Sequence, residues 1–361
     1  MLLDITVLSG DGIGPEVTEQ ALHVLQAVSD RFRHQLQVQH KLIGGAALKV
    51  ANDPLPADTL QACVSSSAVL LGAVGNPEFD KNPGHLRPEA GLLRIRRELD
   101  AYANLRPAVF FAALEDSSPL RPELVRGTDI MIVRELLGGA YFGQPRSIEG
   151  DHGSRVAINT MKYAEHEVER IARVAFDLAR KRRKKVLSVD KANVLECSRL
   201  WRDVVTRIGK EYSEVELGHQ YVDSAAMLLV QRPTEFDVIL TENMFGDILS
   251  DQAGGVVGSL GLLASASIGG KVGLYEPVHG SAPDIAGKGI ANPLGAILSG
   301  AMLLRYSFNL EQEALCIEQA VSSVLNAGAR TADLAGKSHT PISTATMGCR
   351  VVDAVKNAKQ T

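Results

Sequence analysis

The chain has 361 residues with a formal net charge of −4, and 45% of its residues are hydrophobic, 22% charged and only 5% aromatic. This composition is typical of a globular α/β protein with an aliphatic core, and the length predicts one large domain or two fused domains. The nearly balanced charge excludes a global cationic field of the kind that attracts nucleic acid or anionic membranes.

The first predicted elements are a strand, a glycine-rich turn and a helix. Residues 4–8 form an apolar run typical of a buried strand, and Pro15 stands where the first turn of a helix accepts proline. The turn between them approaches the dinucleotide-binding pattern G-x-G-x-x-G, but its third glycine comes one place early, at Gly14. We therefore expect Gly10, Gly12 and Gly14 to make a tight strand-to-helix connection and not a Rossmann cofactor site.

Further strands are predicted at 68–74, 129–133, 186–189 and 236–240, where short apolar runs occur. Amphipathic helices lie between several of them, notably at 165–181. This alternation predicts a largely parallel sheet with covered faces. The basic run at 180–185 closes a helix, where cations suit the negative end of the helix dipole; a nucleic-acid patch is the alternative.

Cysteine spacing and the N-terminus bear on the compartment. Cys63, Cys197, Cys316 and Cys349 show no paired spacing, which favours free thiols in a reducing compartment. Residues 1–4 have neither a basic region nor an apolar signal segment, and no apolar run approaches the ~20 residues of a membrane helix. We expect a cytoplasmic protein.

The segment 87–107 is the first with possible binding chemistry. If its middle is helical, Leu92, Leu93 and Arg96 lie on one side, at positions i, i+1 and i+4. That face suits a ligand that carries both a branched alkyl group and a carboxylate. Taken alone, the pattern is also that of two core leucines beside a solvated arginine.

Several polar residues follow predicted strands. Arg134 ends the strand at 129–133 and precedes a glycine-rich segment at 138–143, Lys191 follows the strand at 186–189, and Asp223 lies in the segment 220–223. Ligand sites of open α/β sheets gather at the carboxyl ends of strands, so these positions are candidates. Individually, each is also compatible with an ordinary surface or ion-paired residue.

The strongest local pattern is the segment 241–251, which follows a strand and opens a helix. Asp247 and Asp251 are four residues apart, so their carboxylates share one helix face, where they repel each other unless a cation lies between them. Hard oxygen ligands without cysteine or histidine favour Mg²⁺ or Mn²⁺ over zinc. The alternative is a pair of carboxylates that complements the helix dipole.

A long segment rich in glycine and proline runs from 276 to 293. A loop of this length is uncommon in a compact domain unless it binds something. His279 could stack on a purine, and Asp284 could accept hydrogen bonds from ribose hydroxyls and repel a 2′-phosphate, which favours NAD over NADP. An ordinary surface Ω-loop is the alternative.

In this order and combination, these segments resemble the isocitrate/isopropylmalate dehydrogenase family. The resemblance extends from the N-terminal turn to about Asn292, whereas the rest of the chain matches only loosely, as helical packing. It implies the family's two-domain α/β fold with a mostly parallel sheet, which is not a Rossmann fold. The first domain is expected to be discontinuous, at 1–103 plus 257–361, with a second domain at 104–256 for substrate, metal and dimerisation.

The resemblance also implies an NAD-dependent and Mg²⁺- or Mn²⁺-dependent oxidative decarboxylation. Tyr141 and Lys191 are the expected proton-transfer groups, and Asp223, Asp247 and Asp251 the expected metal ligands. The expected substrate contacts are Arg96, Arg106, Arg134, Asp223, Leu92 and Leu93. The expected cofactor contacts are Asn76, Glu89, His279, Gly280, Ser281, Ala282, Pro283, Asp284, Ile285 and Asn292.

Members of this family are usually homodimers, so a homodimer is expected here. The resemblance places an arm exchanged between subunits near 143–159. Lys191 and Asp223 are then expected to reach the active site of the partner subunit.

Leu92 and Leu93 bear on the choice of substrate. Isocitrate enzymes place a hydroxyl or amide side chain where they receive a third carboxylate, whereas leucines suit the isopropyl group of 3-isopropylmalate, with about 1–3 kcal/mol of discrimination. D-malate/tartrate and homoisocitrate dehydrogenation are the alternatives within the family. A catalytically silent regulatory subunit is the alternative outside that chemistry.

The chain departs from the family's usual pattern at two positions. Glu242 adds a negative charge before the metal segment, where a small residue is common, and Asn76 replaces a frequent glycine. The first departure could alter metal affinity, and the second could alter loop mobility.

Overall fold

The computed structural model describes residues 1–336 and 339–358. Its main sheet has ten strands: β1 (Leu2–Gly10), β2 (Gln35–His40), β3 (Ala68–Ala73), β4 (Ala103–Val109), β5 (Asp129–Glu135), β8 (Lys185–Asp190), β9 (Glu216–Tyr221), β10 (Val238–Thr241), β11 (Ala264–Ile268) and β12 (Gly273–Pro277). Their order across the sheet is β2-β1-β3-β12-β11-β4-β5-β10-β8-β9.

The prediction of a largely parallel sheet is confirmed. β1, β2, β3 and β12 pair in parallel, as do β5, β10, β8 and β9. Near the middle, β11 is antiparallel to both of its neighbours, and β4 is antiparallel to β5. Two predicted positions were wrong: the strand expected at 236–240 begins only at Val238, and Arg134 lies inside β5, which runs on to Glu135.

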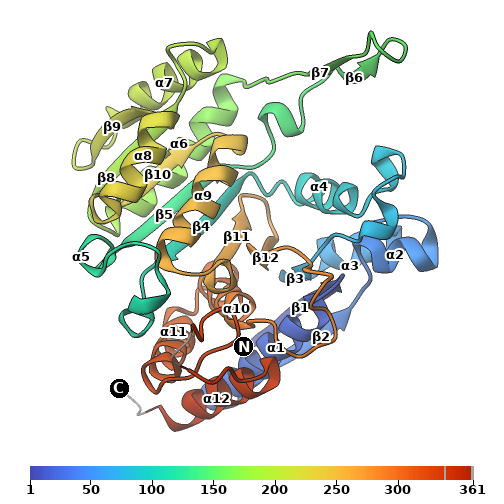
Figure 1. Cartoon of the computed structure of the whole chain (residues 1–361), viewed down its shortest axis with the longest axis vertical. Coiled ribbons are helices and arrows are strands. Elements are labelled where there is room, and N and C mark those ends of the chain that lie inside the picture. The colour runs from blue at the N-terminus through green and yellow to red at the C-terminus, as the bar shows by residue number, and fades with distance from the viewer. Residues whose placement is uncertain (337–338, 359–361) are drawn as a thin grey trace.

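Helices cover both faces of this sheet (Figure 1). They are α1 (Gly14–Phe32), α2 (Gly44–Ala51), α3 (Ala57–Ser65), α4 (Pro88–Glu98), α5 (Pro122–Val125), α6 (Glu165–Arg180), α7 (Glu196–Gly209), α8 (Val222–Gln231), α9 (Asn243–Val257), α10 (Leu294–Ser307), α11 (Glu311–Asn326) and α12 (Thr344–Asn357). Alternation along β5 explains the layers, because Met131 and Val133 pack with the α6 side whereas Ile130 and Ile132 pack with α8 and α9.

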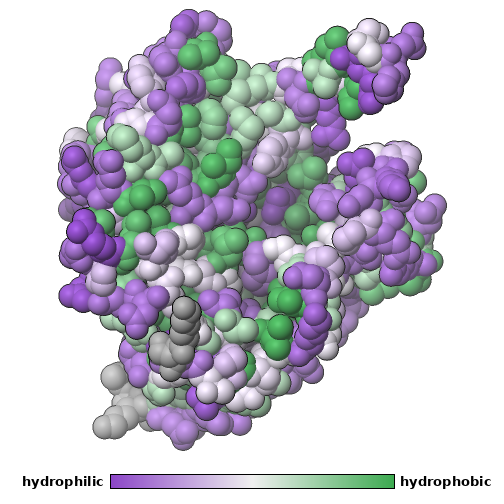
Figure 2. All heavy atoms as spheres, in the orientation of Figure 1, coloured by the Kyte–Doolittle hydropathy of each residue, from purple (hydrophilic) through white to green (hydrophobic). Residues whose placement is uncertain are grey.

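The predicted division at residues 103 and 257 follows the sheet. Strands β2, β1, β3, β12 and β11 form one half, and β4, β5, β10, β8 and β9 form the other. Figure 2 shows the surface hollowed between the part of the chain that carries α9 and the part that carries α4, with hydrophilic residues inside the hollow. The two-domain division itself stays a prediction.

A two-stranded hairpin, β6 (Arg146–Glu149) with β7 (Val156–Asn159), projects from the body of the molecule (Figure 1). Its apolar side chains find no cover within one chain, since Ile148 is 64% and Val156 58% exposed. A lone hairpin of this kind is at best marginally stable in water, so an external partner for it is expected.

The four cysteines are free, as predicted. Among the helices that the structure describes, none is long and apolar enough to span a membrane.

Candidate active site

Helix α9 brings the two predicted metal carboxylates to the hollow. Its first turn is stabilised by Glu242, whose carboxylate accepts hydrogen bonds from the backbone N–H groups of Met244 (3.1 Å) and Phe245 (2.7 Å). A side-chain acceptor at this position satisfies amides that have no partner inside the helix. Asp247 and Asp251 then follow one turn apart on the same helix, as predicted.

Asp247 is the centre of an ion-pair cluster. Its Oδ1 accepts hydrogen bonds from Arg106 Nη1 at 3.1 Å and from Arg134 Nη1, and its Oδ2 accepts one from the Tyr141 hydroxyl at 2.8 Å. Arg106 reaches Asp251 Oδ1 only at 3.5 Å. The structure therefore brings together five of the predicted site residues, from β4, β5, α9 and the short turn at Gly139–Tyr141.

The arginines of this cluster are buried, with exposed side-chain fractions of 2% for Arg134 and 8% for Arg106. Burial and the adjacent Arg106 charge lower the pKa of Arg134 to about 10, and burial lowers the pKa of Arg106. Burial opposes ionisation of Asp247, but the two guanidinium groups outweigh it and lower the pKa of Asp247. The two arginine charges are thus buried more deeply than the two aspartate charges that face them, and buried guanidinium groups suit an anionic ligand.

Asn243 connects the parts of this cluster. Its side-chain oxygen accepts hydrogen bonds from Arg134 Nε (2.9 Å) and Nη2 (2.7 Å), while its side-chain nitrogen donates to the carbonyl oxygens of Leu136 and Gly138, both at 3.1 Å. Asn243 therefore ties a substrate-clamp candidate to the turn that carries Tyr141. The segment 241–251 was singled out from the sequence, but no role was expected for this asparagine.

Two buried carboxylates, Glu135 and Glu242, lie next to the turn that carries Tyr141. Glu135 accepts hydrogen bonds from the backbone N–H groups of Leu137 (3.0 Å) and Gly138 (2.8 Å), and burial raises the pKa of Glu135 to about 7. The Tyr163 hydroxyl donates to Glu242 at 3.2 Å. Glu242 is 3% exposed, and its carboxylate caps α9. Its effect on metal affinity stays a prediction.

Arg96 lies apart from Asp247 and pairs with Glu276 of β12, at 2.7 Å from Nη2 to Oε1. Its Nε is buried and has no hydrogen-bond partner, so a donor is free for a ligand. On the same helix, Leu93 lines a cavity beside Tyr141, whereas Leu92 packs against the core formed by the N-terminal strands. Of the two predicted alkyl contacts, Leu93 is the better placed.

Lys191 and Asp223 form a pair of their own, with Lys191 Nζ donating to Asp223 Oδ1. Lys191 follows β8, and Asp223 lies in the first turn of α8, directly after β9. Among the described residues, no group of three or more histidine, cysteine or acidic side chains could hold a metal ion. One chain therefore does not unite Asp223 with Asp247 and Asp251.

The residues present nevertheless fit a divalent cation. Burial and the charge of Asp247 raise the pKa of Asp251, so the pair is an unfavourable arrangement of like charges that a cation would relieve. Asp251 has a 55% exposed side chain, and its only ion-pair partner within 4 Å among the described residues is Arg106, at 3.5 Å. Hard oxygen donors of this kind suit Mg²⁺ or Mn²⁺.

The predicted cofactor loop lies against the N-terminal glycine turn. The Ile13 backbone N–H donates to the Ser281 carbonyl at 2.8 Å, and a Cβ at Gly12, which has φ +57°, would lie 1.9 Å from that oxygen. Gly12 is therefore needed for a close approach to this loop as well as for the turn. At Gly75 a Cβ would meet Ser281 Oγ at 3.1 Å and Glu89 Oε1 at 3.5 Å, so these two predicted cofactor contacts lie together.

The other predicted cofactor contacts differ from one another in burial and in hydrogen bonding. His279 Nε2 is buried without a partner, and burial lowers the pKa of the imidazole. Asp284 is exposed, as a hydrogen-bond acceptor for ribose hydroxyls requires. The Asn292 side chain donates to Asp333 at 2.9 Å and accepts from the Leu294 N–H at 3.0 Å. The Asn76 side chain accepts from the Glu78 N–H at 3.1 Å, so both asparagines also stabilise the backbone next to them.

Comparisons with known proteins agree with the geometry. A family model described as isocitrate/isopropylmalate dehydrogenase matches residues 4–351. The chain is 58% identical to a 3-isopropylmalate dehydrogenase of Priestia megaterium, over 94% of this chain and 92% of that one, and 55% identical to one of Aquifex aeolicus, over 98% of each. A crystal structure of isocitrate dehydrogenase from Methylococcus capsulatus superposes with a TM-score of 0.88 at 37% identity, covering 98% of this chain and 99% of that one.

The family match corrects one expectation. The resemblance was expected to fade after about Asn292, but the match runs on to residue 351 and includes α10, α11 and most of α12. These helices bury aliphatic side chains against α1 and the sheet and carry few motif residues, so their sequence gave little basis for recognition.

Proposed function

The chain belongs to the isocitrate/isopropylmalate dehydrogenase family, and on this premise we propose that it catalyses the NAD-dependent oxidative decarboxylation of 3-isopropylmalate. The product is 2-oxo-4-methylpentanoate, the precursor of leucine. The observation that carries the proposal is the buried cluster in which Arg106, Arg134 and Tyr141 converge on Asp247, with Leu93 beside it.

Each residue of the cluster has a role in the proposed reaction. Arg106 and Arg134, with Arg96, bind the carboxylates of the substrate by bidentate hydrogen bonds. Lys191 of the partner subunit takes the proton of the C2 hydroxyl as hydride passes to NAD. Tyr141 returns a proton to carbon after carbon dioxide has left, since its hydroxyl lies at the same carboxylate as the two arginines.

A divalent cation belongs to the proposal. Asp247 and Asp251 would hold it with Asp223 of the partner subunit. When bound, the cation would supply electrophilic stabilisation of the charge that develops on the C2 oxygen. The C3–carboxylate bond of the oxidised substrate then breaks and carbon dioxide leaves, while the electron pair of that bond stays on the substrate until Tyr141 protonates C3.

The substrate assignment has two supports. Relatives that are 53–58% identical to this chain are named 3-isopropylmalate dehydrogenase, and the Leu93 side chain offers an apolar contact for the isopropyl group. NAD is favoured over NADP by the exposed carboxylate of Asp284, which repels a 2′-phosphate.

The homodimer is also part of the proposal. The projecting hairpin and the exposed apolar side chains Met227 (52%) and Ile248 (58%) on α8 and α9 leave surfaces for a second copy. A second copy docked there would supply the pair of Lys191 and Asp223 that one chain keeps apart from Asp247.

We also propose that the enzyme is located in the cytoplasm.

A steady-state comparison tests the proposed function. With NAD and Mn²⁺, kcat/KM for 3-isopropylmalate is expected to exceed that for isocitrate, D-malate and homoisocitrate by at least about tenfold, because the isopropyl group alone is worth about 1–3 kcal/mol in an apolar pocket. EDTA should abolish NADH formation, and added Mn²⁺ should restore it. A tenfold preference for D-malate would overturn the substrate assignment, and turnover in EDTA would overturn the metal.

A further inference from the structure

We propose that a cavity beside Tyr141 is an outer anion-binding subsite, at which Arg97 and Arg146 capture the dicarboxylate substrate before the buried arginines bind it. This inference rests on the proposed function, because it takes the substrate to be a dianion. It assigns a role to two arginines outside the buried cluster.

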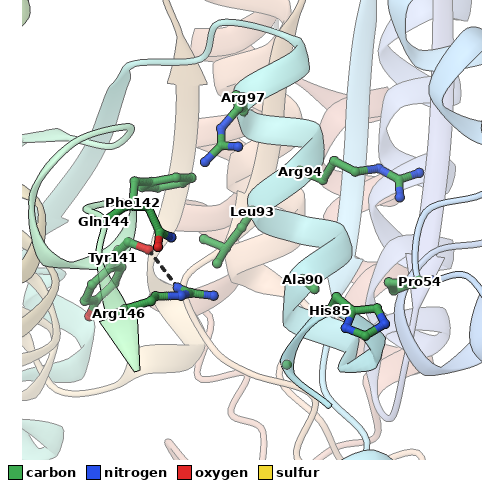
Figure 3. Close-up of a pocket in the computed structure, with 11 residues that line it drawn as sticks. Pro54, His85, Ala90, Leu93, Arg94, Arg97, Tyr141, Phe142, Gln144 and Arg146 are labelled. Atoms are coloured by element: carbon green, nitrogen blue, oxygen red, sulfur yellow. Dashed lines mark hydrogen bonds between the residues drawn. The ribbon is translucent and has the colours of Figure 1, made fainter. Parts of the chain in front are cut away.

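The cavity has a volume of about 330 Å³, within the ~300–1,000 Å³ range of small-molecule sites. Leu93 and Tyr141 line it, so it opens on the site already described. Figure 3 shows Arg97 and Arg146 on the Tyr141 side of α4, with Leu93 between them, whereas Arg94 points to the other side of the helix.

The lining is cationic. It includes three arginines and His85, and none of the described residues that line it is acidic. Arg94 is paired with Asp53 at 3.1 Å, so its charge is largely compensated. A cleft lined by one sign of charge raises the local concentration of an oppositely charged ligand.

Arg97 and Arg146 keep their charges available. Within residues 1–336 and 339–358 neither forms an ion pair: the Arg97 guanidinium lies 5.1 Å from the centre of the Phe142 ring, and Arg146 Nη1 donates to the Tyr141 carbonyl oxygen at 3.3 Å. Within one chain both side chains are exposed. Their contacts fix the position of each guanidinium without neutralising it, which is what capture of an anion requires.

The two arginines also link the parts of the chain that meet at the hollow. Arg97 belongs to α4, and Arg146 begins β6, while Phe142 and Tyr141 lie between them in sequence and space. A dianion held by both guanidinium groups would lie beside the Leu93 side chain and the backbone of the turn that carries Tyr141. In the proposed sequence of binding, the dianion passes from this position to Arg106 and Arg134.

The test measures kcat/KM for 3-isopropylmalate in Arg97→Gln and Arg146→Gln at two salt concentrations. At about 0.01 M NaCl, where the Debye length is ~30 Å, each variant is expected to lose about three- to tenfold in kcat/KM. kcat and the KM for NAD should stay within about twofold of the wild-type values, and the defect should nearly vanish at about 1 M NaCl, where the Debye length is ~3 Å.

Two further variants make the result specific. Arg350→Gln removes the same charge from an exposed position of α12, and is expected to behave as wild type at both salt concentrations. Arg97→Lys retains the charge and should keep most of kcat/KM. The proposal is overturned if the Gln variants match Arg350→Gln, or if Arg97→Lys is as defective as Arg97→Gln, which would assign the effect to packing on Phe142.

The wild-type assay separates this inference from the proposed function. Absence of wild-type turnover with 3-isopropylmalate contradicts the proposed substrate. The salt series is then run with whichever dicarboxylate the enzyme oxidises, and its outcome decides the subsite alone.

Discussion

Asp247→Asn is expected to lower kcat by at least about 10³-fold and to destabilise the fold by about 3 kcal/mol. The loss of activity follows because this carboxylate is both a proposed metal ligand and the acceptor for Tyr141. The loss of stability follows because the buried Arg134 would lose its counter-charge and the buried Arg106 would keep only Asp251, at 3.5 Å. About 3 kcal/mol is the lower end of the usual cost of breaking a buried pair, chosen because the Asp247 side chain is 33% exposed.

Asp251→Asn is the matched control for this prediction. Asp251 lies one turn further along α9, is 55% exposed and approaches Arg106 only at 3.5 Å. Its removal should also abolish metal-dependent turnover, but should change the free energy of unfolding by less than about 1 kcal/mol. Equal destabilisation of the two variants in urea denaturation would show that Asp247 does not neutralise the buried arginines.

Lys191→Met is expected to lower kcat by at least about 10²-fold, as for loss of a group that transfers protons, with little change in NAD binding. Among the described residues, the Lys191 ammonium has one hydrogen-bond partner, Asp223, and it lies 6.0 Å from the centre of the Tyr221 ring. Steady-state kcat and a fluorescence titration with NADH measure the two effects separately.

Lys185→Met serves as its control, because Lys185 begins β8, the strand that Lys191 follows, and its side chain forms an exposed pair with Glu216 at 3.5 Å. This variant should turn over as wild type does. Retained turnover in Lys191→Met would place the general base elsewhere.

Much of the fold was predictable because the strands that matter are short apolar runs between amphipathic helices. The runs at 4–8, 68–74, 129–133 and 186–189 all lie in the main sheet. What the pattern could not predict is the antiparallel pairing of β11 and β4 at the centre. A pattern of local hydrophobicity reports burial, but carries no information on which strands become neighbours.

The candidate site divides in the same way. Asp247, Asp251, Arg106, Arg134 and Tyr141 were predicted and converge in the structure. Asn243 was missed, although it lies in the same motif, because its function depends on long-range contacts with Arg134 and Leu136. Glu276 was predicted only to begin the loop at 276–293. Its pairing with Arg96 spans 180 residues of sequence, so no local pattern indicates it.

Lys191 and Asp223 do not reach the Asp247 cluster of their own chain. They are held together and kept apart from Asp247, so the proposed reaction requires a second copy to complete each site. In a symmetric dimer the same surfaces serve both subunits, which makes two shared sites the simplest assembly.

A hybrid dimer tests this claim most directly. Asp251→Asn and Lys191→Met subunits, co-expressed with different tags and purified on both, should form dimers in which one site carries both defects and the other carries none. We predict about half of the wild-type activity per dimer, although each homodimer is inactive. A hybrid of Asp251→Asn with Tyr141→Phe, whose defects lie on the same side of the shared site, should remain inactive. An inactive Asp251→Asn/Lys191→Met hybrid would contradict the shared site and with it the proposed mechanism.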